Sequence, residues 1–205
     1  MQMARFCAIY SYKYSVMATL IDKLAQLEGI QHLPEIDPNK QTTAVKDNDM
    51  VDKLAQATIP AVLAGFYKFT RTEENAAQVP IKNSSTDWVE TLFGDEKKQL
   101  TKKIATHAKV SAQTAGDKII QTANHVVTIL KEDLPNADGK SIKNYFTDQR
   151  NDILKHLPAD IEIGNILNDN TLDDRTNKMS GPVSGLMHTI EKTFASTDSE
   201  TPKAK

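Results

Sequence analysis

The sequence predicts an all-α protein, and two features lead to this prediction. Apolar residues recur at helical spacing along most of the chain, and no segment shows the sustained alternation of a half-buried strand. In addition, residues 53–63 (KLAQATIPAVL) are echoed by residues 118–128 (KIIQTANHVVT), and each copy follows a shorter amphipathic segment, 23–27 or 103–107. A short amphipathic helix followed by a longer apolar one cannot bury its apolar face alone. We therefore expect a compact helical domain built from two pseudo-repeated helix pairs plus C-terminal helices.

The composition is that of a globular chain. With 205 residues, of which 39% are apolar and 25% charged, the chain is long enough for a core of its own. Its 25 basic and 27 acidic residues leave a net charge of −2 and no strongly basic stretch, which argues against a nucleic-acid partner. Cys7 is the single cysteine, so no intramolecular disulfide is expected. The longest apolar run, 59–66, is far shorter than the ~20 residues of a membrane span. These features favour a cytoplasmic protein.

Residues 1–16 are aromatic and aperiodic, unlike the rest of the chain. We interpret them as a non-native or disordered N-terminal extension that precedes a true start at Met17. The alternative is a short ordered element that packs on the core. The first amphipathic helix is expected over residues 17–27, ended by Gly29. Residues 33–46 contain two prolines and are expected to form a loop.

The central helix is expected to begin after Asn48 or Asp49, either of which can cap it, and to continue to Phe69. It is apolar on nearly every side between residues 59 and 69, as a helix in the middle of a domain would be. Pro60 should kink this helix or start a second segment. Residues 73–79 can add one or two turns, and 80–86 are the best candidate linker.

The second half begins with a short helix over 88–93, with Asp87 and Glu90 as its capping pair and Gly94 at its end. Leu100, Ile104 and Ala108 then follow at intervals of four. Ser111 is expected to cap the clearest helix of the chain. Its apolar stripe comprises Ala112, Ala115, Ile119, Ala123, Val126, Val127 and Leu130.

A turn over 135–139 separates the repeated core, 17–134, from a C-terminal helical extension, 139–195. This extension should contain a helix over 142–157 that stops at Pro158. A polar, irregular segment over 165–181 and an amphipathic helix over 183–194 should follow. Residues 196–205 are expected to be a disordered tail.

Several short phrases resemble the bacterial YidB-like proteins, the family of the domain of unknown function numbered 937. They are residues 59–66 (IPAVLAGF), 92–94 (LFG), 104–105 (IA), 110–111 (VS), 148–150 (DQR) and 154–158 (LKHLP). The resemblance spans about residues 17–195. The chain departs from the family pattern in its glycine-poor loops and in Lys109, which replaces a small residue. The resemblance implies a helical fold, but no activity and no catalytic residues.

Candidate site residues are few. None of the five histidines pairs with another at i, i+3 or i+4, so no metal site is expected and no cofactor is indicated. Asn124 and His125 form the one polar pair on a core helix, and His107 can approach His125 if the helices of the second unit pack together. An enzyme would require these two histidines to meet at Asp117 or Glu132. The alternative is that both are ordinary boundary histidines.

Two charged segments are further candidate sites. Residues 169–174 (DNTLDD) place oxygen donors as a calcium loop does, but they lack its glycine, and Ser180 stands where the bidentate glutamate should be, so a solvated acidic loop is expected. Lysines gather on one helical stretch and are expected to be a solvated face, with an anionic partner as the alternative. They are Lys97, Lys98, Lys102, Lys103 and Lys109.

The leading functional hypothesis is a non-enzymatic interaction or scaffold protein that binds a protein partner or associates with itself. It follows from apolar helices without a converging polar constellation. The alternative is small-molecule or lipid binding between the helices, which predicts a cavity beside residues 59–69 and 119–130.

Overall fold

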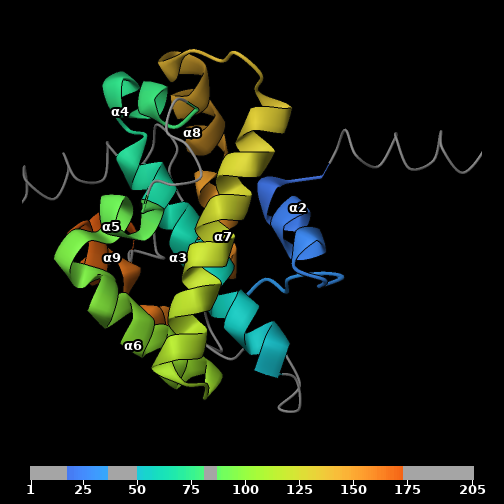
Figure 1. The fold of residues 1–205 in the computed structure, drawn as a ribbon, viewed down its shortest axis with the longest axis vertical. Coiled ribbons are helices and arrows are strands. Elements are labelled where there is room, and N and C mark those ends of the chain that lie inside the picture. Colours follow the sequence, from blue (N-terminus) through green and yellow to red (C-terminus); the bar gives the residue numbers. More distant parts are fainter. Residues whose placement is uncertain (1–17, 37–49, 81–86, 173–205) are drawn as a thin grey trace, which may run out of the picture. The chain divides into compact units, whose positions relative to one another are not determined.

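A computed structural model describes residues 18–36, 50–80 and 87–172 (Figure 1). All secondary structure in these residues is helical, which confirms the predicted all-α class. The elements in chain order are α2 (Leu20–Leu27), α3 (Met50–Phe69), α4 (Glu73–Gln78), α5 (Trp88–Phe93), η1 (Gly94–Glu96), α6 (Lys97–Ala108), α7 (Ala112–Asp133), α8 (Gly139–His156), η2 (Ala159–Ile161), α9 (Ile163–Leu167) and η3 (Asn170–Leu172). No described helix is long and apolar enough to cross a membrane.

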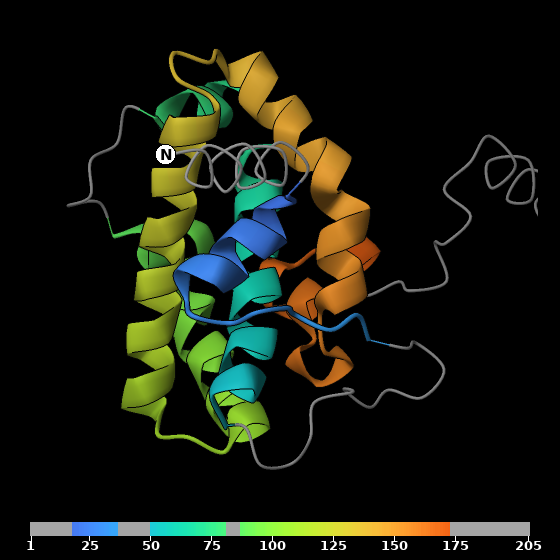
Figure 2. The same cartoon turned by 90° about the vertical axis from the view of Figure 1, so that its right-hand side faces the viewer.

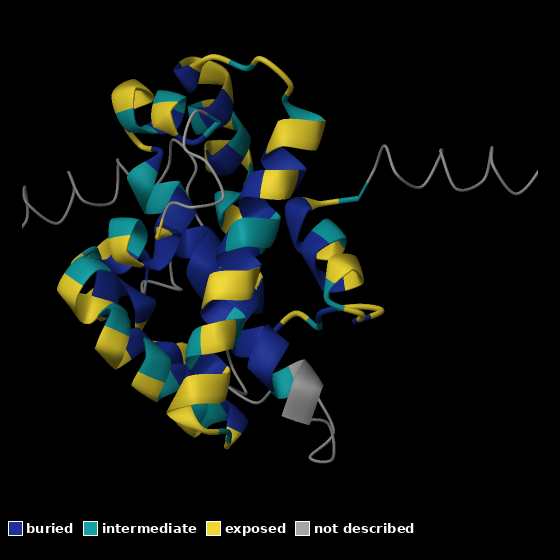
Figure 3. Cartoon of the chain, viewed as in Figure 1, coloured by how far each residue is buried: buried dark blue, intermediate teal, exposed yellow. Residues whose placement is uncertain are grey.

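Helix α3 is the centre of the core, as its sequence predicts. Every residue from Leu54 to Phe66 is buried (Figure 3). The helix continues through Pro60 without interruption, so of the two expectations for this proline the second segment was wrong, and the kink stays a prediction. Gln56 is the largest polar side chain among the buried residues of α3, and its Nε2 donates to the backbone carbonyls of His156 at 2.5 Å and Pro34 at 3.2 Å. These bonds offset part of the cost of burying an amide.

The other helices cover α3 from several sides. Helices α7 and α8 flank it on opposite sides in Figure 2, while α6 and α2 also pack against it. The C-terminal helix α8 shares this core, because Phe146 stacks on Phe66 with ring centroids 5.9 Å apart. The Phe66 ring in turn lies beside Trp88, with ring centroids 5.3 Å apart, and the buried Trp88 anchors α5 in the core. The turn over 135–139 therefore joins two helices, α7 and α8, that pack into the same core.

Side chains that cap the first turn determine where several helices begin. The side chains of Asp87 and Ser111 accept hydrogen bonds from the backbone N–H groups of Glu90 and Thr114, as predicted. Thr19 and Asp22 form a capping box at the start of α2 that the sequence analysis did not identify. Gly29, with φ +78°, follows α2 as expected.

One described segment was wrongly expected to be irregular. Residues within 165–181 belong to α9 and η3, because Ile163, Ile166, Leu167 and Leu172 are buried and hold two short turns against the core. These turns are too short for a periodic pattern to be visible among their Asn and Asp residues. The predicted helix over 183–194, the extension 1–16, the tail 196–205, the Asn48 or Asp49 cap and the linker after Pro80 lie outside the described residues.

The pseudo-repeat stays a prediction, and its two copies lie in different surroundings. Alignment of residues 53–63 with 118–128 places Ala55 opposite Ile120 and Gln56 opposite Gln121. Ala55 and Gln56 are fully buried in α3, whereas Gln121 is exposed and Ile120 is 51% exposed. The first copy is enclosed on all sides, while the second presents one face to the outside.

The close approach of α4 and α8 at Gly139 yields a stability prediction. A Cβ atom at this position would lie 2.2 Å from the backbone oxygen of Glu73, which cannot move aside as a side chain can. We expect Gly139→Ala to lower the free energy of unfolding by about 2 kcal/mol or more in urea denaturation.

Gly116→Ala is the matched control, because its Cβ would meet only the Thr101 Cγ2 atom, at an ordinary 3.8 Å. Since alanine favours a helix over glycine by about 0.8–1 kcal/mol, this variant should be more stable than the wild type. Equal effects of the two substitutions would contradict the packing of α4 against α8.

Candidate functional site: the groove between α6 and α7

The site with the clearest capacity to bind a partner is a groove of about 560 Å³ between α6 and α7. Its floor is apolar and includes the buried Val89 and Ile119 and the half-buried Ala105. The α7 side is formed by Ala112, Gly116 and the exposed Ile120, and the α6 side carries Lys97, Lys98 and Lys102. The groove thus combines an apolar floor with one uncharged and one cationic side.

The local sequence explains why α6 and α7 lie side by side. Lys109 adopts a left-handed conformation (φ 56°) at the end of α6, and Ser111 caps α7, so the chain reverses within three residues. Helix α7 then runs back beside α6 (Figure 1). The Leu100–Ile104–Ala108 face of α6 is buried against the core. The outer faces of the two helices meet along a seam that Asp87 and Val89, at the start of α5, also line.

Gly116 enlarges this seam. In α3 and α8, glycine is needed because a Cβ atom would lie 2.7 Å from Phe93 Cζ at Gly65 and 2.2 Å from Glu73 O at Gly139. Gly116 has no such neighbour, although glycine inside a helix costs about 0.8–1 kcal/mol relative to alanine. Packing therefore does not account for this glycine, and the space its missing side chain leaves belongs to the groove.

The lysines of the groove were predicted as a group, but the groove itself was not. The signal that could have found it was Ile120, which lies beside Ile119 but outside the apolar stripe of α7. An isoleucine on the outer face of an amphipathic helix has no place in the core. Its 51% exposure in the structure confirms this position.

The predicted candidate His125 contributes to a different site, a buried carboxylate. The Glu28 side chain, at the end of α2, has no exposed surface. Its Oε1 atom accepts a 2.6 Å hydrogen bond from Thr122 Oγ1 and lies 3.8 Å from His125 Nδ1. Its Oε2 is compensated by the Lys118 ammonium at 3.0 Å, an ion-pair contact rather than an aligned hydrogen bond. A carboxylate enclosed in this way ties α2 to α7 and is out of reach of a substrate.

His107 and His125 do not share a carboxylate. His107 Nδ1 lies 2.7 Å from Asp160 Oδ2, and this contact lowers the pKa of the Asp160 carboxyl despite its partial burial. Of the two proposed meeting points, Asp117 instead accepts a hydrogen bond from Gln113, and Glu132 is exposed. Asn124 is half-buried, and its backbone carbonyl accepts from Thr128 Oγ1. The geometry required for an enzyme built on His107, His125 and Asp117 is absent.

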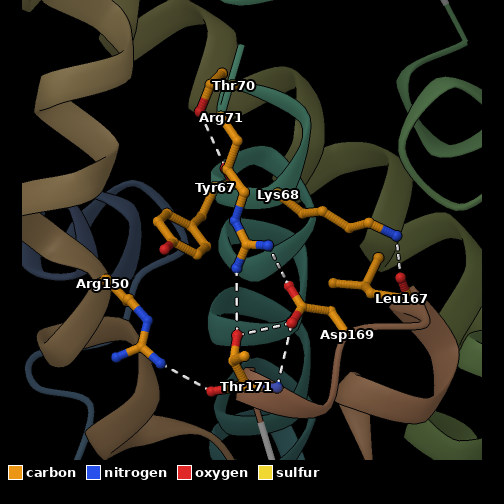
Figure 4. Close-up of polar contacts among 8 residues, drawn as sticks. All are labelled: Tyr67, Lys68, Thr70, Arg71, Arg150, Leu167, Asp169 and Thr171. Carbon is orange, nitrogen blue, oxygen red and sulfur yellow. Dashed lines mark hydrogen bonds and ion pairs between the residues drawn. The ribbon is translucent and has the colours of Figure 1, made fainter. Parts of the chain in front are cut away.

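A second polar network lies where the solvated acidic loop was expected (Figure 4). The Asp169 side chain is only 8% exposed, so that expectation was wrong for this residue. Its Oδ2 lies 2.6 Å from Arg71 Nη1, and its Oδ1 accepts from Thr171 N and Oγ1. Arg150 Nη2 donates to the Thr171 carbonyl at 2.8 Å, and Lys68 donates to the Leu167 carbonyl.

These three cations are used inside the protein. Arg71 also stacks over the Tyr67 ring, with its Cζ 4.8 Å from the centroid. The network fixes α9 and η3 against α3 and α8. Within the described residues, no group of His, Cys, Asp and Glu side chains can hold a metal ion.

Comparisons with known proteins add no identity. The chain has no match among protein-family models, curated proteins or solved structures. The resemblance to the YidB-like family therefore stays a prediction.

The enclosed Glu28 carboxylate gives a stability prediction. Glu28→Gln should lower the free energy of unfolding by about 3 kcal/mol, because it leaves the 14% exposed Lys118 ammonium without its counter-charge. Urea denaturation at neutral pH measures this difference. Glu132→Gln, an exposed change on the same helix α7, is the control and should stay within about 0.5 kcal/mol of the wild type. A Glu28→Gln protein as stable as the control would contradict a structural role for this ion pair.

The Asp169 network predicts a pH dependence. Burial opposes ionisation of this carboxyl, but the Thr171 hydrogen bonds and the Arg71 guanidinium outweigh it and lower the pKa of Asp169. A lowered folded-state pKa stabilises the protein above the ordinary carboxyl pKa of about 4, and this contribution is lost as the pH falls through the folded value.

We therefore expect Asp169→Asn to be less stable than the wild type at pH 7 and the difference to shrink below about pH 4. Thermal unfolding between pH 7 and pH 2.5 measures it. Asp148→Asn, an exposed change on α8, should follow the wild type at every pH. A difference that stays constant across this range would show that the Asp169 charge is not the stabilising element.

Proposed function

We propose that this chain is an interaction protein and that the groove between α6 and α7 takes its partner. The observation that carries the proposal is the apolar floor of the groove, bordered by the half-exposed Ile120. Large apolar side chains on a surface are most informative when they border a concave apolar patch. Leu27 and Ile120 are the large hydrophobic residues exposed among the described ones, and Ile120 lines the groove.

Gly116 supports the same proposal. A residue that lowers helix stability without a packing reason is typical of a surface shaped for binding. The polar clusters offer no competing site, because Glu28, Asp160 and Asp169 all take partners from other elements of the same chain. The proposal includes that the chain is a cytoplasmic protein of bacterial origin that is similar to the YidB-like family.

The groove also supports the alternative, a small apolar ligand, at a place different from the one expected. Its volume of about 560 Å³ is in the range of small-molecule sites. It includes Ile119 but no residue of 59–69, which are buried in or half-buried around the core. Both functions therefore use the same surface and share the first experiment.

That experiment is a fluorescence titration of the full chain with Nile red, an uncharged apolar dye. The wild type should bind it saturably at one site. Gly116→Leu, which places a side chain in the groove, should reduce the affinity at least tenfold. Gln121→Leu, on an exposed position of α7 outside the groove lining, should leave it unchanged.

Circular dichroism of each variant checks that the helices are retained. Ile120→Asp is a second variant at an exposed position and should weaken dye binding without loss of fold. Absence of saturable binding to the wild type, or equal binding to the folded Gly116→Leu protein, would contradict the proposed surface.

A further inference from the structure

The charges along α6 are paired unevenly. Lys97 forms an ion pair with Glu90, which raises the pKa of the lysine, and Lys103 Nζ lies 2.9 Å from Glu162 Oε2. Lys98 and Lys102 have no ion pair within the part of the chain that the structure describes, and both are exposed and line the groove. The unpaired positive charge of this helix therefore lies at the edge of the apolar floor.

Lys98 and Lys102 form one positively charged patch because they are four residues apart on α6. They lie on the same helix face, about 6 Å apart along the axis. The opposite side of the groove, Ala112, Gly116 and Ile120, carries no charge. Asp87 also lines the groove, and it acts on Lys97, which Glu90 already pairs. A matching partner must therefore be apolar on one face and acidic along one edge of that face.

The exposure of the residues that line the groove favours a helix over a small ligand as its occupant. Only Val89 and Ile119 of the lining are buried, and the other lining residues are half-buried or exposed. A small ligand usually buries 70–90% of its surface, so an open seam between two helices suits it less well than an enclosed cavity would. An amphipathic helix needs to bury only one face. The stretch from Lys98 to Thr106 is about 12 Å long, enough for two turns of such a helix.

We infer that the groove binds an amphipathic helix of a partner protein, with its apolar stripe on Ala105, Ile119 and Ile120 and acidic side chains along the edge that faces Lys98 and Lys102. This inference rests on the proposed function and specifies the partner's chemistry. A symmetric contact between two copies of this groove is disfavoured, because it would bring the same lysines of both copies close together.

The test starts from a displayed library of 18-residue helical peptides with a fixed apolar stripe at i, i+3, i+4 and i+7 and random flanking residues. The library is selected on the full-length wild type after removal of peptides that bind Gly116→Leu. We expect the retained peptides to carry Asp or Glu along one edge of the stripe. A retained set with neutral or basic flanks would overturn the inference while leaving the groove as a binding surface.

The strongest peptide is then measured by fluorescence anisotropy. The double variant Lys98→Glu/Lys102→Glu should bind it about tenfold or more weakly, and binding to the wild type should weaken with added salt. Lys131→Glu/Lys140→Glu makes the same charge change at exposed positions outside the groove lining and should bind as the wild type does. Equal losses in both double variants would overturn the inference, because net charge alone would explain them.

Two further outcomes would separate this inference from the proposed function. If no peptide is retained although Nile red binds, the groove takes a small apolar ligand and the helix inference fails. If light scattering shows a dimer that Gly116→Leu abolishes, a second copy occupies the groove and the inference also fails. If neither dye nor peptide binds, both proposals fail together.

Discussion

The rest of the structure depends on the complete burial of α3. From Leu54 to Phe66 this helix has no exposed residue, so every face of it needs an apolar neighbour. Helices α2, α6, α7 and α8 supply these neighbours and use their own apolar faces to do so. Because the buried residues follow one another around α3, the surrounding helices must enclose it on every side. This explains why α8, which follows the 135–139 turn, contributes Phe146 to the aromatic cluster of Phe66 and Trp88.

Several polar side chains stabilise the packing of these surrounding helices. Glu28 ties α2 to α7, Asp160 ties η2 to α6 through His107, and Asp169 ties the last described turns to α3. Tyr145 belongs to the same class, since it donates to Asp133 while burial raises the pKa of its phenol to about 12. The outer face of the α6–α7 pair, by contrast, carries described groups that have no such role. Its open apolar floor, helix-weakening glycine and unpaired lysines lie together, and the functional proposals rest on this combination.

Local patterns in the sequence predicted much of the fold. The Ser111 cap, the stripe of α7 and the continuous apolar character of α3 each depend on residues within a few turns of one another, so they can be found without knowing the tertiary structure. Helix α9 was missed because tertiary burial of Ile163 and Ile166, rather than periodicity, holds it. The site residues were harder to predict. Thr122 bonds to Glu28 across 94 residues, and no spacing rule relates the two. The groove depends on how α6, α7 and the start of α5 pack together, which local sequence patterns do not give.

The enclosure of α3 leaves the α6–α7 seam as the proposed binding surface, and methyl NMR tests this most directly. The full chain, labelled at Ile, Val and Ala methyl groups, is titrated with Nile red. We predict that the shifted resonances are those of Val89, Ala105, Val110, Ile119 and Ile120, while Ile59 and Val62 of α3 stay unchanged. Shifts centred on α3 would place the ligand inside the core, and shifts confined to α2 or α9 would place it elsewhere on the surface. Either result would contradict the account.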